Sequence, residues 1–326
     1  MNGKIQKIIN YLYLNYQYIE SRGLLNGRMG LALLFYEYSR YSKINDYSDF
    51  ADFLIDDVFE VFFNNPELYN LNDFYNGISG VGWGIQYLFD NDFVDEDSGE
   101  MLSVFDKRVE NLLFTSNELN EKNAQVYFQT EDAFLGIDHY FFYRKKNTEE
   151  YAGKILGYYE KIFVPEIFYP LFFLNSVLAY LIKIRNSGLD MPLQRMIEEK
   201  VIAGIYCSIS KKSYDESDLI ILSRLIEHFD NNIKNEVNDF MTENNVKSNT
   251  SSIDDIFLYF KITWQELLYH GKIYTKIDEM LLAKFLDEDL FNLSSKKLAL
   301  NNGLAGLALN IVLTDKQQKS EREKKL

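Results

Sequence analysis

A short pattern, Asn-Gly-x-x-Gly, occurs three times in the 326 residues: as NGRMG at 26–30, as NGISG at 76–80 and as NGLAG at 302–306. Each copy leads directly into an apolar run, and a degenerate copy, FLGIDHYFFY, occupies 134–143. Self-similarity of this kind is typical of repeat proteins, in which each repeat buries its apolar face against its neighbours. We therefore expect the chain to be built from repeats that begin at these turns.

The spacing of the glycines predicts about six repeats. The first glycines of successive copies are 50 residues apart (27 to 77) and then 59 (77 to 136), and the 167 residues from 136 to 303 hold three more intervals of about 56. The fourth repeat is expected near LFFLNSVLAYL at 171–181, where Asn175 and Ser176 replace Asn-Gly. The fifth is expected within 220–270 and is not located more closely by the pattern.

Apolar residues recur at helical spacing along most of the chain. In 4–19, for example, Ile5, Ile8, Ile9 and Leu12 fall on one face of a helix. Only four prolines occur, and no Val/Thr-rich alternating run indicates a strand. The sequence therefore predicts an all-α protein in which each repeat is a pair of helices, one amphipathic and one more apolar.

Full-strength copies of the pattern stand near both ends of the chain. An open solenoid needs atypical polar repeats that cap its ends, whereas a closed ring needs none. We therefore expect an α/α toroid, a closed ring of about six helical hairpins with apolar helices in the inner layer and amphipathic helices in the outer layer. This single domain is expected to span 1–314, and the polar basic segment 315–326 is expected to be a frayed tail.

Charge and cysteine usage narrow the classes of partner. The formal net charge is −15, so the chain lacks the basic face that nucleic acids and anionic membranes attract. An acidic surface would favour a basic partner such as a cationic peptide, and the simpler alternative is that the charge serves solubility. The N-terminal segment shows neither the apolar run nor the cleavage site of a signal peptide. Because Cys207 is the single cysteine, no disulfide can form within the chain, and we expect a cytoplasmic protein.

The repeated pattern suggests a structural role and a place for a site. Asparagine is a good N-cap, and glycines three residues apart lie on one helix face and let a neighbouring helix end approach closely. If all inner helices point the same way, their N-termini converge on one mouth of the ring, and their dipoles attract an anion there. The residues expected to line this mouth are Asn26, Arg28, Asn76, Ser79, Trp83, Asp138, His139 and Asn302.

Three segments, GLLNGRMGLALLFYEYSR, FYNGISGVGWGIQYLF and LALNNGLAGLALNIVL, resemble the repeats of the lanthionine synthetase C-like (LanC-like) proteins. The resemblance covers about half the chain, over 20–143 and 296–313. It implies an α/α toroid and peptide chemistry, in which cyclases add a cysteine thiol to a dehydrated serine or threonine of a ribosomally made peptide. It also implies a zinc ion that binds the thiol and lowers its pKa.

The chain departs from that family at the zinc ligands. The cyclases hold zinc through two cysteines and a histidine, with a Cys-His pair directly before a repeat glycine, whereas Asn301 and Asn302 precede Gly303 here. Amide side chains are poor zinc ligands beside thiolate and imidazole. Cys207 and His270 are two remaining candidate ligands, but Cys207 is expected to be a buried structural cysteine. We therefore expect no cofactor.

Other candidate chemical groups are few. His139, which follows Asp138, is a candidate acid/base residue at the mouth, with a purely structural histidine as the alternative. Asp56 and Asp57, with Glu60 one turn later, have the spacing of a magnesium–diphosphate site, but they more simply form the solvated face of a helix. A sugar hydrolase on a six-hairpin toroid would need paired carboxylates, and the acidic residues near repeat starts are Asp73, Asp132 and Asp138.

Three functions stay open from the sequence. The first is a LanC-like protein of bacterial ribosomal peptide modification without zinc, either a remnant cyclase or an accessory that binds a precursor peptide at the mouth and presents it to a partner modifying enzyme. The second is a six-hairpin glycoside hydrolase. The third is a non-catalytic scaffold.

Overall fold

The computed structural model describes residues 2–64, 74–94, 98–115, 135–144, 149–163, 168–189, 191–212, 214–229, 231–243, 256–271, 273–288, 290, 293, 297–300 and 303–323. These residues form fourteen α-helices and two short 3-10 segments, with no β-strand among them. The expectation of an all-α chain is confirmed.

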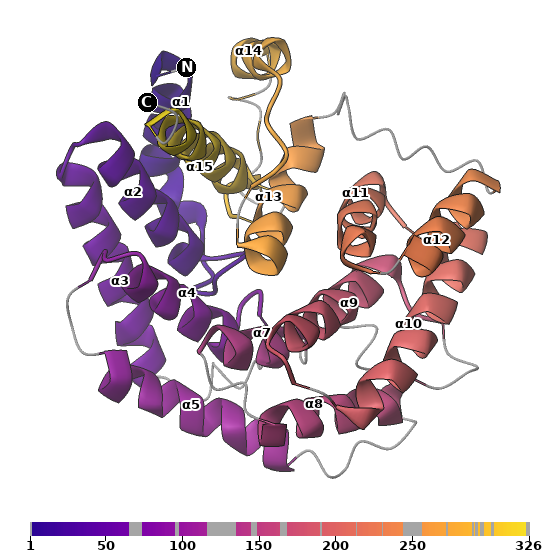
Figure 1. The fold of residues 1–326 in the computed structure, drawn as a ribbon. Helices are drawn as coiled ribbons and strands as arrows, with labels where there is room; N and C mark the ends of the chain where they lie inside the picture. The colour runs from indigo at the N-terminus through magenta and orange to yellow at the C-terminus, as the bar shows by residue number, and fades with distance from the viewer. Residues whose placement is uncertain are drawn as a thin grey trace. The chain divides into compact units, whose positions relative to one another are not determined.

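The chain divides into two compact units, whose helices are labelled in Figure 1. Unit 1 comprises Met1–Leu102 and Ile253–Leu326, and unit 2 comprises Ser103–Ser252. The helices of unit 1 are α1 (Asn2–Asn15), α2 (Arg28–Ser42), α3 (Asp46–Asn64), α4 (Ile78–Asp90), α13 (Ile256–His270), α14 (Glu279–Glu288) and α15 (Leu304–Glu323), with the 3-10 segment η1 (Tyr16–Tyr18). The helix α5 (Ser98–Thr115) crosses the boundary. Those of unit 2 are α7 (Leu135–Tyr143), α8 (Glu149–Ile162), α9 (Leu171–Asn186), α10 (Pro192–Ser210), α11 (Glu216–Leu225) and α12 (Asn231–Glu243), with η2 (Ile226–His228).

Unit 1 has two layers of helices. In the inner layer α2 packs against α4 and α15, and α15 packs against α13. The first eleven or so residues of these helices are buried without a break, over 29–39 in α2, 78–88 in α4 and 304–314 in α15. A helix that is apolar on all sides needs neighbours on all sides. The amphipathic helices α1, α3 and α14 supply the second layer, with α3 against α2 and α1 against α15.

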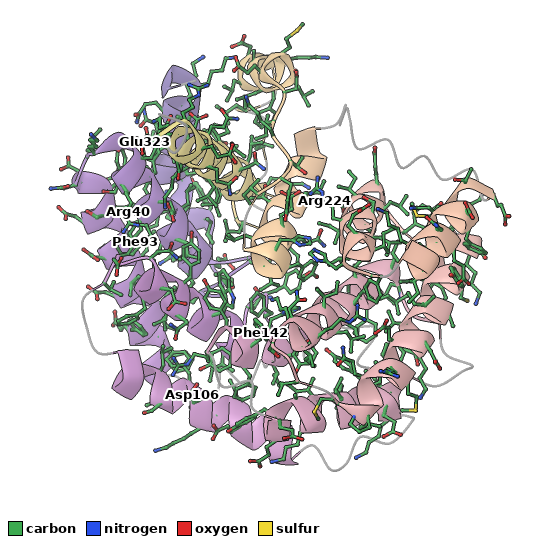
Figure 2. The ribbon with its side chains drawn as sticks, in the orientation of Figure 1. Arg40, Phe93, Asp106, Phe142, Arg224 and Glu323 are labelled. Carbon is green, nitrogen blue, oxygen red and sulfur yellow. The ribbon has the colours of Figure 1, made fainter. Side chains whose placement is uncertain are left out.

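Unit 2 repeats this layering around α9. This helix is buried along most of its length and packs against α7 and α11 in its own layer and against α10 in the outer layer. The outer helices α8, α10 and α12 pack in succession. Asp106 of α5, labelled in Figure 2, accepts a hydrogen bond from the Tyr140 hydroxyl (2.7 Å) and pairs with Arg144 (2.9 Å), which joins α5 to the segment of α7. The apolar stretch 171–182 thus lies in a buried helix. No helix in the described parts of the chain has the length and apolar character to span a bilayer.

The two ends of the chain meet within unit 1. The helix α15 packs against both α1 and α2. Lys316 pairs with Glu37 (3.2 Å), and the Tyr41 hydroxyl donates to Asp315 (3.0 Å). The expectation of a frayed tail is therefore wrong for 315–323, because α15 continues through Glu323 and its side chains bind α2, whereas 324–326 lie outside the described residues.

The helices follow one another as an outer and then an inner helix, which gives seven pairs in the described residues rather than about six. The fourth inner helix is α9, where the sequence predicted it, but it begins at Leu171, four residues before Asn175. The later inner helices α11 and α13 start without an Asn-Gly pair, which is why the glycine spacing missed one repeat.

Candidate functional site

The glycines of the repeated pattern allow close contact between backbones. A Cβ placed on Gly30 would lie 2.0 Å from the Leu24 carbonyl oxygen, and a Cβ on Gly80 would lie 2.0 Å from that of Phe74. Both carbonyls lie six residues before their glycine, so the two repeats share one geometry. The predicted close approach at these glycines is confirmed, and any side chain there would force the turn away from the helix.

Adjacent turns also bind one another. The Leu25 amide donates to the Tyr75 carbonyl (2.9 Å), and a Cβ on Gly23 would meet Asn76 Cα at 2.2 Å. The starts of α2 and α4 therefore lie side by side in unit 1.

The predicted asparagine caps are wrong by one residue. The N-cap residues of α2 and α4 are Gly27 and Gly77, both with extended backbone, so Asn26 and Asn76 stand one position before the cap. The Asn76 side chain instead accepts a hydrogen bond from the Ser21 hydroxyl (3.0 Å). A Cβ on the cap residue Gly27 would lie 2.4 Å from the Gly23 amide nitrogen and 2.6 Å from the Ser21 carbonyl oxygen, so the segment before α2 leaves no room for a side chain at that cap.

Three inner helices of unit 1, α2, α4 and α15, run in the same direction. Their starts lie together, since Leu300, just before α15, fills the space beside Gly30 of α2. Their later halves also lie together, since the Tyr87 hydroxyl of α4 donates to Glu37 of α2 (2.7 Å), which pairs with Lys316 of α15. The N-terminal ends of α2, α4 and α15 thus face one side of the unit, as expected.

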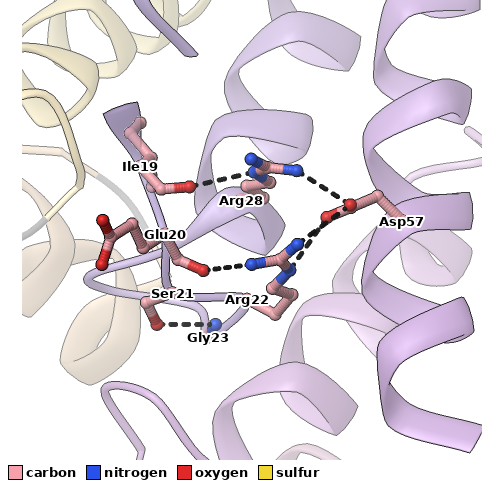
Figure 3. Close-up of polar contacts among 7 residues, drawn as sticks. All are labelled: Ile19, Glu20, Ser21, Arg22, Gly23, Arg28 and Asp57. Atoms are coloured by element: carbon pink, nitrogen blue, oxygen red, sulfur yellow. Dashed lines mark hydrogen bonds and ion pairs between the residues drawn. The ribbon is translucent and has the colours of Figure 1, made fainter. Parts of the chain in front are cut away.

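Arg28, expected at the mouth, is engaged in structural contacts (Figure 3). Its Nε donates to the Ile19 carbonyl (2.9 Å) and its Nη1 pairs with Asp57 of α3 (2.8 Å). Arg22 binds the same carboxylate, with Nε 3.1 Å from Oδ2. The two guanidinium groups tie the segment before α2 to α3. Because Asp57 is neutralised in this way, the magnesium–diphosphate interpretation of Asp56 and Asp57 finds no support.

The other predicted mouth residues have different surroundings. Ser79 and Trp83 are buried in α4, and the Trp83 ring stacks on Tyr87 with centroids 5.5 Å apart. Asn26 and Asn76 are half-buried in the turns. Asn302 lies outside the described residues.

Unit 2 contains a buried polar cluster around the predicted acid/base pair. Asp138 and His139, both in α7, are almost fully buried. The Asp138 carboxylate accepts from the Tyr159 hydroxyl of α8 (2.5 Å) and from the His139 backbone amide (2.7 Å). The His139 ring has Nε2 3.0 Å from the Ser176 hydroxyl and Nδ1 3.3 Å from Lys183 Nζ, both on α9. The three helices thus place five polar side chains together inside the unit.

The partners of His139 set its tautomer. A lysine ammonium can only donate, so Nδ1 accepts from Lys183 and Nε2 carries the proton, which it donates to Ser176. In this arrangement His139 does not remove the proton of Ser176, so the pair is not an activated nucleophile.

Burial shifts the protonation of the cluster. It raises the pKa of Asp138 to about 7, against the opposing effect of the Tyr159 hydrogen bond, the His139 amide and the Lys183 charge. It lowers the pKa of Lys183 to about 8, partly offset by Asp138. Burial and the nearby ammonium also hold the pKa of His139 well below its usual value. Groups that titrate near neutral pH can exchange protons, so the cluster has acid/base capacity.

Sequence reasoning named Asp138 and His139 but missed Lys183 and Tyr159. The sequence offered one signal for Lys183, which is a charged residue within the apolar run that forms α9. Lys183 is half-buried, whereas Asp138, His139, Tyr159 and Ser176 are buried.

The residues do not fit the zinc site of the cyclases. Cys207 is exposed on α10 and not buried as expected, because the apolar face of that helix runs through Val201, Ile205 and Ile209 and Cys207 lies off it. His270 ends α13 in unit 1, with its ring edge against Tyr274 (5.3 Å). Within the described ranges, no three His, Cys, Asp or Glu side chains are grouped to hold a metal.

The carboxylates named for a sugar hydrolase form no pair in the described residues. Asp73 and Asp132 lie outside them, and Asp138 is enclosed between α7 and α8. A glycosidase needs two carboxylates on opposite sides of the substrate bond.

The two layers of paired helices define the class of fold, an α/α toroid. The solved structure titled "Nisin cyclase" is similar over 97% of this chain and 94% of that chain, with a TM-score of 0.62 at 14% sequence identity. The predicted LanC-like fold is thereby confirmed. No family model matches the sequence, and no curated protein matches it.

Proposed function

We propose that this protein is a LanC-like peptide-binding protein of bacterial ribosomal peptide modification that acts without a zinc-bound thiolate. The observation that carries the proposal is the similarity in fold to nisin cyclase along nearly the whole chain. The net charge of −15 supports a cationic peptide as the ligand. The reducing cytoplasm, which keeps peptide thiols free, is the compartment that suits this role.

The set of possible zinc ligands in this chain favours an accessory role over a remnant cyclase. Thioether formation needs a thiolate at neutral pH, and a metal or a neighbouring cation must lower the thiol pKa to supply it. The single cysteine of this chain is exposed on an outer helix, so the protein offers no cysteine pair for zinc. We therefore propose that it holds a precursor peptide by the turns that contain Asn26 and Asn76 and presents it to a partner modifying enzyme.

The test uses a cationic peptide that carries one dehydroalanine and one cysteine. We expect the purified protein to bind this peptide in a calorimetric titration, to contain zinc far below one ion per chain, and to leave the peptide thiol open to iodoacetamide. A peptide with alanine in place of dehydroalanine is the control for uncatalysed thiol loss. Thiol loss faster than in a protein-free sample would show a cyclase, and absence of binding would favour a scaffold.

A further inference from the structure

Unit 1 contains a pocket of about 430 Å³ whose walls come from α2, α3, α4 and the segment after α4. Eight of its ten lining residues are aromatic or aliphatic, and the other two are Asp52 and Asp56 of α3. No basic residue is among these described lining residues. The pocket is distinct from the glycine turns, since its residues on α2 and α4 lie in the later halves of those helices.

The two carboxylates lie on one face of α3, one turn apart, and both side chains are exposed. Asp52 accepts a hydrogen bond from the Tyr36 hydroxyl. Asp56 makes no hydrogen bond or ion pair within the described part of the chain, whereas its neighbour Asp57 is held by two arginines. The pocket therefore has an uncompensated negative charge at one wall.

The negative charge suits a cationic ligand, and the aromatic walls of the pocket suit one as well. Phe59, Phe89 and Phe93 are partly exposed in the pocket, and Phe93 lies 5.5 Å from the Tyr36 ring. The Phe93 ring already takes a cation, since the Arg40 guanidinium lies 3.7 Å from its centroid without lining the pocket (Figure 2). Aromatic faces attract lysine and arginine heads, and they also pack against the apolar stems of these side chains.

We propose that this pocket binds an arginine or lysine side chain of a peptide together with one adjacent apolar residue. The carboxylates of Asp52 and Asp56 receive the cation, and the aromatic and aliphatic walls receive the apolar neighbour. A volume of this size holds a group of dipeptide dimensions rather than a whole peptide. The inference rests on the proposed peptide-binding function and names a second contact that selects basic–apolar sequences.

The first measurement is a calorimetric titration of the full chain with acetyl-Phe-Arg-amide and with its citrulline analogue. Citrulline keeps the shape of arginine but carries no charge. We expect the arginine peptide to bind about tenfold more tightly, with the difference reduced by added salt. Equal binding of the two peptides would overturn the proposal, and so would equal binding of butylamine, which would make the pocket a site for small amines.

The second measurement compares Asp56→Asn with Asp49→Asn, which remove the same charge, and adds one double variant. Asp56→Asn should weaken binding of the arginine peptide about fivefold, and the double variant Asp52→Asn/Asp56→Asn should weaken it further. Asp49→Asn, an exposed position on the same helix outside the pocket, should leave binding unchanged. A loss of affinity as large in Asp49→Asn as in Asp56→Asn would show unspecific attraction and refute the site.

This test is separable from that of the proposed function. If acetyl-Phe-Arg-amide binds but the longer cationic peptide with dehydroalanine and cysteine does not, the pocket stands and the proposed binding of a precursor peptide fails. If only the longer peptide binds, the pocket assignment fails and the peptide-binding function stands.

Discussion

At the scale of the residue, Asp138 shows how burial changes the protonation of a side chain. Its carboxyl lies inside unit 2, yet it keeps two donors, the Tyr159 hydroxyl and the His139 amide. Desolvation outweighs those donors and the nearby Lys183 charge, so its pKa rises to about 7. A structural carboxylate would gain from a depressed pKa, so this environment is typical of a group that exchanges protons.

The raised pKa of Asp138 predicts how stability depends on pH. Because the folded state holds this proton more tightly than the unfolded state, the free energy of unfolding should fall as pH rises from about 4 to about 7. Asp138→Asn removes the titrating group while keeping an acceptor for Tyr159, so it should remove this part of the slope. Urea unfolding of both proteins across this range measures it. Asp49→Asn, which changes an exposed carboxylate, should retain the slope, and a slope that persists in Asp138→Asn would contradict the assignment.

At the scale of the element, the start of each inner helix is determined by backbone contact rather than by a capping side chain. The amide of Leu25 donates to Tyr75, and the carbonyls of Leu24 and Phe74 touch the following glycines. The repeated pattern is therefore a packing device, and its asparagine is available for other contacts, as Asn76 shows with Ser21.

Two glycine substitutions should have opposite effects on stability. In Gly80→Ala the new Cβ meets the backbone of Phe74, which cannot move without opening the turn, so we expect a loss of about 1–3 kcal/mol. In Gly157→Ala, within α8, the new Cβ meets nothing within 4 Å, so the lower entropy of the unfolded chain should stabilise the protein by about 0.5–1 kcal/mol. Chemical denaturation of both variants tests this pair, and a neutral Gly80→Ala would refute the packing role.

At the scale of the molecule, the chain ends are part of one unit. The helix α15 lies against α1, α2 and α13, and its polar second half is anchored by Lys316 on the buried Glu37. The contact joins residues 279 positions apart, so closure of unit 1 depends on the last helix being in place.

A deletion of 315–326 tests this closure. It removes the partner of Glu37 and the acceptor of Tyr41, and it leaves a buried carboxylate with Tyr87 alone. We expect a loss of roughly 1–3 kcal/mol, reduced from the full cost of an unpaired buried charge because Lys316 is half-exposed. A deletion of 324–326 keeps all of α15 and should be neutral. Equal midpoints for both truncated proteins in thermal unfolding would show that 315–326 does not stabilise unit 1.

Local patterns in the sequence were enough to predict the helices, their two layers and the close contacts at the glycine turns. Apolar spacing reports which face of a helix is buried, and a glycine at a contact reports missing space, so both are visible in short stretches of sequence. They also drew attention to Asp138 and His139, whose role as site residues stays a prediction.

The remaining features depend on residues that are distant in the chain and near in the fold. Lys183 contacts His139, which lies 44 positions away in the sequence, and Arg22 binds Asp57, which lies 35 positions away. The exposure of Cys207 and the helical structure of the second half of α15 likewise depend on which neighbours each helix packs against. Spacing along one helix carries no information about its partner, so these contacts, and the charge state of the cluster that they create, exist only once the helices have packed.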